Sequence, residues 1–355
     1  MWKDRRLTQL FGIEHPIIQA PMGGAAVPLL AAAVTNAGGL GSLGTATLPA
    51  VERRRQVDEL LALTSGPINL NYFVHAEPVV DVVRTARLQA RLAAWYAEHG
   101  AGKPPAPAVL VPTFDAEALD HLLTVRPAVA SFHFGLPKPT DVAAIKAAGI
   151  KLIATATTPQ EAKALEAGGV DAVIAQGWEA GGHRGTFAPP YDKGQIGTFA
   201  LVPQVADAVG VPVIAAGGIA DGRGIAAALM LGASAVQLGT AFLSCPEANV
   251  HPLHRLALTQ AERASIVTPA FTGRPARALA NRCAADLTDA EADILDFPLQ
   301  ISQMWPLMQA TVARGSSEFL PMWTGQAYGL NRTMPAAELV ATLAREAMAR
   351  LASAA

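Results

Sequence analysis

The chain has 355 residues, of which 51% are hydrophobic and 16% charged, and its 27 basic and 29 acidic side chains give a net charge of −2. This composition is typical of a globular enzyme with a large core, and it excludes a disordered chain. The two cysteines, Cys245 and Cys283, lack the paired spacing of a metal or dithiol motif, so we expect no disulfide framework and a reducing compartment.

No segment of the sequence has the length and character of a membrane span. The longest apolar run, residues 25–34, is about half of the roughly 20 residues that a spanning helix needs. The charged N-terminus is not followed by an apolar stretch of the length that a signal peptide needs, because Gln9, Glu14 and His15 interrupt it. We therefore expect a cytoplasmic protein without a membrane partner.

One module recurs along the chain: an alanine-rich helical stretch ends in Ala-Gly or Leu-Gly, and a short apolar run follows. Glycine just past a helix end adopts the left-handed closing conformation at little cost. Continuous apolar runs are typical of parallel strands that are covered on both faces. Eight strands are predicted, at residues 16–22, 40–43, 68–73, 129–134, 151–156, 172–176, 213–216 and 235–238. Eight alternating units favour a closed (β/α)8 barrel over an open doubly wound sheet.

Two stretches exceed the length of an ordinary crossover. Residues 74–127 contain a helical pattern at 82–99, and residues 246–334 look mostly helical. Pro335 then opens a last amphipathic helix. We therefore predict a barrel domain of residues 1–245, completed by the C-terminal helix 335–355, and a mostly helical cap of residues 246–334 inserted after the eighth strand.

The spacing G-x-G-x-x-G occurs at residues 39–44. A dinucleotide fingerprint follows a strand and opens a helix, whereas this segment follows a helical stretch and is itself a predicted strand. We interpret these glycines as helix-to-strand packing residues.

The ends of the last two predicted strands favour a phosphate site. In a (β/α)8 barrel, the loops after strands seven and eight commonly bind phosphate through main-chain N–H groups. Here they contain Gly217, Gly218 and Gly239, which lack a β-carbon, and Thr240, which adds a hydroxyl.

The loop after the sixth strand, residues 175–185, places His183 among Gly181, Gly182 and Gly185. Histidine exchanges protons near neutral pH, so we predict His183 as a general base at the catalytic rim. Glu179 and Arg184 are interpreted as scaffold or solvated neighbours. His133, at the end of the fourth strand, faces the same rim and is predicted to contact substrate.

Other functions find little support. His251 and His254 are three residues apart but lack a third ligand at a recognisable spacing, so no metal site is predicted. Lys and Arg are dispersed without a basic stripe, which argues against nucleic acid. No Gly-x-Ser-x-Gly elbow for serine hydrolysis occurs.

Several motifs together resemble the nitronate monooxygenases, also called 2-nitropropane dioxygenases. The resemblance covers most of the chain, and the segments that carry it are residues 19–24 (QAPMGG), 69–73 (NLNYF), 175–185 (AQGWEAGGHRG), 216–219 (AGGI), 237–240 (QLGT) and 271–277 (FTGRPAR).

The resemblance implies a TIM-barrel flavoenzyme with non-covalent FMN. Pro21 and Met22 would pack beside the flavin ring, and Asn71 and Gln176 would hydrogen-bond its polar edge. The implied cofactor-binding residues are Ala20, Pro21, Met22, Asn71, Gln176, Gly181, Gly182, Gly217, Gly218, Gln237, Leu238, Gly239 and Thr240. The expected phosphate site and the implied FMN phosphate site coincide.

The resemblance also implies the reaction. Alkyl nitronates, and nitroalkanes where accepted, would be oxidised by O2 to a carbonyl compound and nitrite, with His183 removing the α-proton. The main class of the family carries tyrosines and a lysine in a cap helix, whereas residues 299–308 have neither. Met304 and Met308 are expected to make a less polar pocket.

Two alternatives remain at this point. The first is NAD(P)H-dependent reduction of a quinone or an enoyl thioester on the same barrel, and the second is a flavin-free barrel that binds a phosphorylated ligand. We expect small-molecule partners only, and a monomer or a homodimer.

Overall fold

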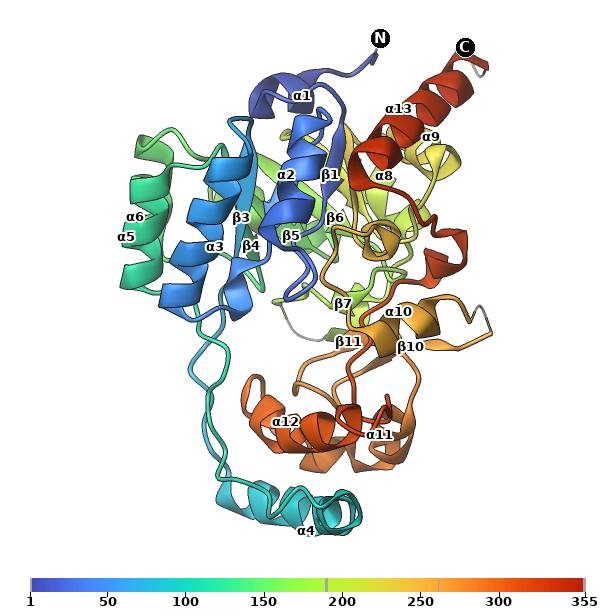
Figure 1. Ribbon diagram of the computed structural model, residues 1–355. Coiled ribbons are helices and arrows are strands. Elements are labelled where there is room, and N and C mark those ends of the chain that lie inside the picture. The colour runs from blue at the N-terminus through green and yellow to red at the C-terminus, as the bar shows by residue number, and fades with distance from the viewer. Residues whose placement is uncertain (1, 189–190, 261, 354–355) are drawn as a thin grey trace.

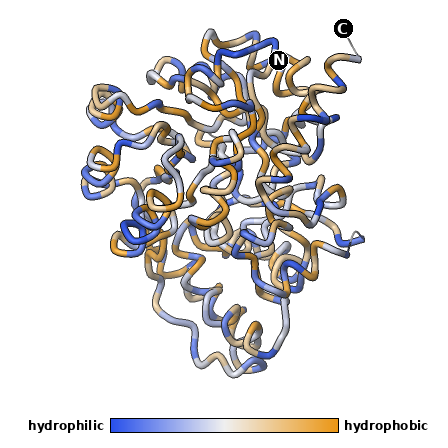
Figure 2. Tube along the Cα trace, turned by 45° about the horizontal axis from the view of Figure 1, so that its top comes forward, coloured by the Kyte–Doolittle hydropathy of each residue, from blue (hydrophilic) through white to orange (hydrophobic). Residues whose placement is uncertain are grey.

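The computed structural model describes residues 2–188, 191–260 and 262–353. Figure 1 shows a barrel in the upper part of the view and a smaller cap below it. Hydrophobic and hydrophilic residues alternate along the helices of both parts, as Figure 2 shows from a second direction. No helix in the described residues combines the length and the apolar character that a membrane span requires.

A closed parallel barrel forms the larger part, which confirms the predicted fold class. The hydrogen-bonded order is β1-β9-β8-β6-β5-β4-β3-β2, and a parallel bridge between Ile18 and Leu40 joins the two ends of this order. The barrel strands are β1 (Ile17–Gln19), β2 (Gly41–Leu43), β3 (Ile68–Phe73), β4 (Val129–His133), β5 (Lys151–Ala156), β6 (Ala172–Gln176), β8 (Val213–Ala216) and β9 (Ala235–Leu238).

Two strands end earlier than the sequence predicts. β1 stops at Gln19 because the chain turns at Met22, whose carbonyl oxygen accepts the N–H of Ala25 (3.1 Å) and of Ala26 (2.7 Å). β4 stops at His133 because Phe134 has φ +73°, a left-handed conformation that is rare for a residue with a side chain. Both departures lie at the C-terminal mouth of the barrel.

Helices alternate with the strands and cover the outside of the barrel. Gly41 packs so tightly on α2 that a β-carbon there would overlap the carbonyl oxygen of Ala31, which supports the packing interpretation of the glycine-rich segment. α13 packs against α2 and α9. These helices are α1 (Arg6–Phe11), α2 (Pro28–Asn36), α3 (Ala50–Leu63), α5 (Ala116–Val125), α6 (Pro139–Ala147), α7 (Pro159–Ala167), α8 (Thr198–Ala208), α9 (Gly222–Met230) and α13 (Ala336–Ser353).

The cap has its own core. It contains α10 (Pro252–Leu258), α11 (Arg282–Asp286), α12 (Leu299–Val312), and a hairpin of β10 (Ser265–Thr268) and β11 (Ala276–Leu279), which the helical interpretation of this region missed. Met304 is buried in the core of the cap, whereas the sequence suggested a pocket position.

Helix α4 (Val82–His99) is joined to the barrel by two extended segments and lies beside the cap (Figure 1). It packs against α12, and the hydroxyl of Tyr96 donates to the carbonyl oxygen of Gln303, 207 positions later in the chain (2.7 Å). We therefore propose that α4 belongs with the cap, although the sequence division counts it with the barrel.

A small antiparallel sheet joins the cap to the barrel. The two-residue strand β7 (Gly182–His183) lies in the loop after β6 and pairs with β11, so that His183 is opposite Ala276. The loop that carries the predicted base is thus part of a sheet with the cap hairpin.

Candidate active site

The inward-facing side chains of the barrel change from apolar to polar toward the mouth. Ile153 and Ile174 belong to the buried apolar cluster in the lower part of the barrel. Two positions further along the same strands stand Thr155 and Gln176, and side chains two residues apart in a strand point to the same face. The resulting polar set includes Asn71, Ser131, Thr155, Gln176 and Gln237.

Gln176 fixes the loop after β6. Its Nε2 donates to the carbonyl oxygen of His183 (3.0 Å), and its Oε1 accepts the N–H of Gly185 (2.8 Å). The resemblance implied a bond from Gln176 to the flavin ring, which stays a prediction; in the structure both ends of this amide bind the loop. Gln176 therefore positions His183.

Arg184 and Glu179 also hold this loop, as scaffold residues would. Arg184 is 3% exposed and donates to the carbonyl oxygens of Gly177 (2.6 Å) and Gln176 (3.0 Å). The Glu179 carboxylate accepts the N–H and the hydroxyl of Thr198, the first residue of α8 (both 2.8 Å). Neither side chain is a solvated neighbour.

The hydrogen bonds of His183 determine which ring nitrogen is basic. Nε2 lies 3.0 Å from Oγ1 of Thr272, whose hydroxyl donates to the carbonyl oxygen of Arg274 (3.3 Å). Thr272 therefore accepts from Nε2–H, and the lone pair is on Nδ1. No hydrogen bond within the described residues uses Nδ1. Burial, followed by the charges of His133 and Arg274, lowers the pKa of His183 to about 3, so the ring is neutral at neutral pH.

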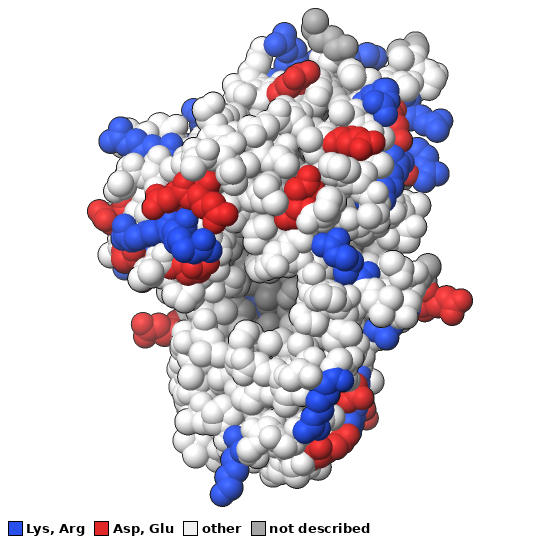
Figure 3. Space-filling view, viewed as in Figure 1, with Lys and Arg blue, Asp and Glu red and all other residues white. Residues whose placement is uncertain are grey.

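Aromatic rings from both the barrel and the cap surround this imidazole. The ring centroid of His183 lies 5.3 Å from that of Trp323, 5.5 Å from Phe297, 5.8 Å from Phe134 and 6.0 Å from Phe73. A shell of this kind excludes water and holds the ring in one orientation. Figure 3 shows a hollow between the barrel and the cap, with mostly uncharged residues around it.

His133 lies behind His183, with both ring nitrogens bonded to protein. Nε2 is 3.1 Å from the carbonyl oxygen of His183, and Nδ1 is 3.0 Å from Oγ1 of Thr155. Since a carbonyl only accepts, Nε2 carries the hydrogen. Burial lowers the pKa of His133 to about 3. These contacts favour a positioning role for His133 over the substrate contact that the sequence suggested.

The predicted phosphate site consists of unpaired main-chain donors. Gly217 and Gly218 have φ of +106° and +70°, conformations that favour glycine. In the part of the chain that the structure describes, the N–H groups of Gly218, Gly239 and Thr240 make no hydrogen bond. Adjacent free N–H groups of this kind are typical of an anion site.

A segment of the cap crosses this site, which sequence reasoning missed. The N–H of Gly325 donates to Oγ1 of Thr240 (2.9 Å). Gly181 lies so close to the segment that a β-carbon on it would approach the nitrogen of Gly325 to 2.5 Å. Because Thr240 accepts this bond, its hydroxyl hydrogen is available to an anion on the other side.

The remaining predicted cofactor residues border the same mouth. The N–H of Ala20 donates to the carbonyl oxygen of Leu238 (2.8 Å), which places the turn of residues 20–22 beside the end of β9. A β-carbon on Gly239 would lie 3.6 Å from Sδ of Met22. Nδ2 of Asn71 donates to Oγ of Ser131 (3.0 Å). Pro21 lies within this turn, and Gly182 has φ +73° in β7.

These residues fit an FMN-type ligand on two independent observations. The glycine loops offer free donors for a phosphate, and Oε1 of Gln237 is buried without a partner in the described structure. An orphaned amide oxygen in a buried position costs free energy unless a ligand donor or a water reaches it. Gln237 precedes Gly239 of the phosphate loop by two residues. One ligand could therefore bind the free N–H groups of the loop and the unpaired Oε1 of Gln237.

Sequence reasoning missed Thr272, Phe297, Trp323 and Gly325. Thr272 lies within the segment of residues 271–277 that carries the resemblance, so that motif was the available signal. Phe297 and Trp323 stand in no recognisable pattern, and only the folded chain brings them to His183.

A closed parallel barrel with a buried histidine and a set of unpaired main-chain donors at its C-terminal mouth is typical of a (β/α)8 barrel enzyme. The sequence also matches the family model described as "Nitronate monooxygenase" over residues 4–346. The chain therefore belongs to the nitronate monooxygenase family of oxidoreductases, which is generally flavin-dependent.

Individual relatives agree with this assignment. The chain is 46% identical to a nitronate monooxygenase from Pseudomonas aeruginosa over 96% of this chain and 98% of that one. It is 38% identical to a probable nitronate monooxygenase from Staphylococcus aureus over 97% of both chains. Among solved structures, it resembles a nitroalkane oxidase from Streptomyces ansochromogenes, with a TM-score of 0.88, 38% identity, and coverage of 99% of this chain and 100% of that one. It also resembles FabK from Thermotoga maritima, with a TM-score of 0.75, 30% identity, and coverage of 98% and 97%.

Proposed function

We propose that this protein oxidises alkyl nitronates, and nitroalkanes that it can deprotonate, with O2 to a carbonyl compound and nitrite. The observation that carries the proposal is the neutral imidazole of His183, whose unpaired Nδ1 lies at the same barrel mouth as the phosphate cradle. The family and the similarity to a nitroalkane oxidase support this choice of reaction.

Non-covalent FMN would bind at the mouth of the barrel. Gly217, Gly218, Gly239 and Thr240 would hold its phosphate, and Gln237 would meet a polar group of the cofactor with its unpaired Oε1. FMN would supply the electron acceptor for the substrate and the site of reaction with O2.

The side chains of the protein handle the proton and the orientation of the substrate. Nδ1 of His183 would accept the α-proton of a neutral nitroalkane, and Thr272 would hold the Nε2–H tautomer while this occurs. Gln176 and His133 fix the main chain of His183 through its carbonyl oxygen. An anionic nitronate needs no proton removal, so the base matters less for that substrate.

The low pKa makes His183 available as a base over a wide pH range. A neutral ring accepts a proton at any pH above its own pKa, so protonation of His183 would not limit turnover between pH 5 and 8. The same low pKa makes the ring a weak base, and the negative charge that develops on the substrate would offset this in the complex.

The absorbance spectrum of the purified protein, followed by anaerobic titrations, tests the proposal. We expect a flavin spectrum that a nitronate bleaches and that NADH leaves unchanged on the same time scale. Bleaching by NADH alone would favour the reductase alternative, and a colourless protein that does not bind added FMN would favour the flavin-free barrel.

His183→Asn tests the base separately. We expect the variant to keep its flavin and its fold, to lose about 10²–10⁴-fold in turnover of a neutral nitroalkane, and to lose much less with preformed nitronate. Equal activity with the neutral substrate would contradict the assignment. The cytoplasmic location and the monomeric or homodimeric state stay predictions from the sequence.

A further inference from the structure

The back of the β7–β11–β10 sheet borders a second cavity, of about 630 Å³. This volume lies within the range of small-molecule sites. Side chains alternate between the two faces of a strand, so His183 and Arg184 project to opposite sides of the sheet. The ring of His183 enters the barrel mouth, whereas Arg184 and Arg277 line the cavity. The small sheet thus separates this cavity from the catalytic mouth.

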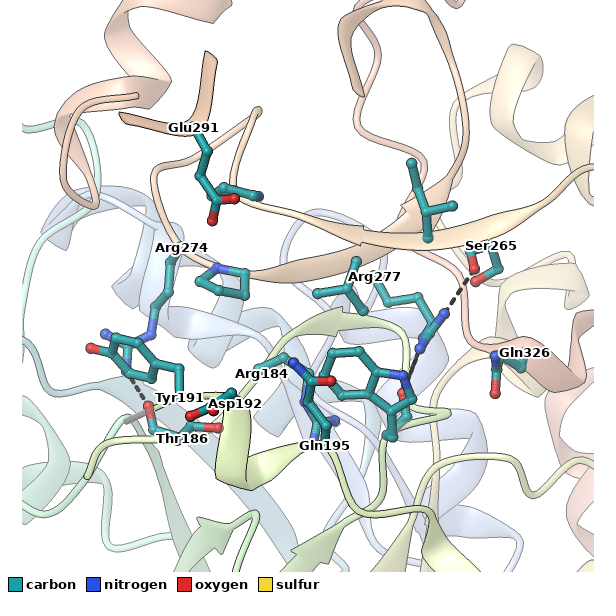
Figure 4. A pocket seen from close by; sticks show the side chains of 15 residues that line it. Arg184, Thr186, Tyr191, Asp192, Gln195, Ser265, Arg274, Arg277, Glu291 and Gln326 are labelled. Carbon is teal, nitrogen blue, oxygen red and sulfur yellow. Dashed lines mark hydrogen bonds between the residues drawn. The ribbon is translucent and has the colours of Figure 1, made fainter. Parts of the chain in front are cut away.

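Three guanidinium groups line the cavity: Arg184, Arg274 and Arg277 (Figure 4). Arg184 and Arg277 are 3% and 2% exposed. Each of the three arginines donates to main-chain carbonyl oxygens, such as that of Gly194 for Arg184 (3.0 Å) and that of Trp178 for Arg277 (2.8 Å). Within the described residues, no carboxylate forms an ion pair with any of them.

In the described residues, the direct partners of these three cations are carbonyl oxygens and aromatic rings, such as that of Phe134, 3.9 Å from the guanidinium carbon of Arg274, and no carboxylate contacts them. Two carboxylates nearby are bound to other groups: the buried Glu161 accepts from the N–H groups of Phe187 and Ala188 (2.7 and 2.9 Å), and the partly exposed Glu179 accepts from Thr198. The exposed Asp192 and Glu291 lie at the rim, and Figure 4 shows Glu291 on the cap side. Burial lowers the pKa of all three arginines, that of Arg184 to about 10, and the charges of Glu161 and Glu179 offset this effect only in part.

Unpaired donors remain on these arginines. Nε of Arg184 and Nε of Arg274 are buried and have no partner in the described structure. Among residues 2–188, 191–260 and 262–353, the side chain of Arg274 forms one hydrogen bond, from Nη2 to the carbonyl oxygen of Thr186, and Nη1 is available. A buried, charged donor without an acceptor is costly, and a bound anion would remove this cost.

We propose that this cavity binds a small organic phosphate, at a site separate from the FMN phosphate cradle. Arginine forks match the oxygens of phosphate, and several guanidiniums together favour a multiply charged anion over a monocarboxylate. The exposed ring of Tyr191 and the amides of Gln195 and Gln326 border the same cavity and would contact the organic part. The proposal does not depend on the nitronate chemistry.

The test is calorimetric titration of the FMN-saturated protein with pyrophosphate, with AMP and with adenosine. We expect saturable binding of AMP and pyrophosphate and none of adenosine, because the phosphate supplies the recognition. Tighter binding of AMP than of pyrophosphate would identify an organic phosphate, whereas binding of pyrophosphate alone would overturn the organic part of the proposal.

Two variants and one control locate the bound anion. Arg274→Gln removes the guanidinium with free donors and should weaken AMP binding about tenfold or more. Val267→Phe fills the cavity without changing its charge and should abolish binding, while Arg91→Gln, on the exposed face of α4, should have no effect. Retained FMN content and an unchanged melting temperature would show that each variant is folded.

Three results would overturn the proposal. The first is the absence of binding of either phosphate to the wild-type protein at millimolar concentration. The second is binding that FMN displaces, because the anion would then occupy the cofactor cradle. The third is binding that neither Arg274→Gln nor Val267→Phe changes.

Discussion

Replacing Thr272 with valine tests the tautomer of His183 in the most direct way. The change keeps the shape of the side chain and removes the hydroxyl that lies 3.0 Å from Nε2 of His183. Thr272 is 7% exposed, so the Nε2–H would lose its acceptor in a place that water hardly reaches. An unsatisfied buried donor costs about 1–3 kcal/mol, and at about 1.4 kcal/mol per factor of ten this is about a 5- to 150-fold loss in the step that uses Nδ1.

The assay compares a neutral nitroalkane with its preformed nitronate under steady-state conditions. We expect kcat/KM of Thr272→Val to fall within that range for the nitroalkane and to change less than about threefold for the nitronate, which has already lost its proton. Thr272→Ser keeps the hydroxyl and should restore most of the activity. Equal losses with both substrates would refute the tautomer argument, because they would indicate a general disturbance of the site.

Two further predictions concern the cofactor and the stability. Gly217→Ala places a β-carbon on a residue with φ +106°, 3.0 Å from the nitrogen of Ala180. We therefore expect much less bound flavin after purification, while the circular dichroism spectrum stays unchanged. A normal flavin content would contradict the proposed cradle. His254 is 8% exposed and bonds to Thr324, and burial lowers its pKa to about 4. Below pH 6.5 the ring of His254 binds a proton in the unfolded chain but stays neutral in the folded chain, so the free energy of unfolding decreases as the pH falls toward 4. From this ring alone, we expect a decrease of about 2–3 kcal/mol between pH 6.5 and 4.5. In His254→Gln this part of the acid dependence should vanish, as urea unfolding at both pH values would measure; an identical pH dependence would show that another group causes it.

The barrel could be predicted from the sequence because its signals are local. Seven of the eight barrel strands are short apolar runs that a glycine separates from the preceding helix, whereas β4 follows Arg126; this pattern needs no knowledge of distant residues. The proposed phosphate cradle rests on local signals too, since Gly217, Gly218 and Gly239 follow strands whose order in the barrel is fixed by counting, and phosphate binding there stays a prediction.

The surroundings of His183 could not be predicted in this way. Thr272 lies 89 residues from His183 in the sequence, and the pairing of β7 with β11 involves two residues of an irregular loop. The resemblance assigns the amide of Gln176 to the flavin edge, and the folded loop also gives this amide a carbonyl oxygen and an N–H as partners. Such contacts depend on tertiary distances that no motif encodes.

The short strand β7 has a consequence for the way in which the cap can move. His183 and Gly182 pair with Ala276 and Arg277 of the cap. A rotation of the whole cap away from the barrel would therefore break these strand-pairing hydrogen bonds or move the imidazole together with the cap. Entry of substrate by rigid rotation of the cap would therefore displace the proposed base at each turnover. Entry through smaller shifts of individual rings, such as Trp323 or Phe297, would leave His183 paired with β11 throughout the cycle.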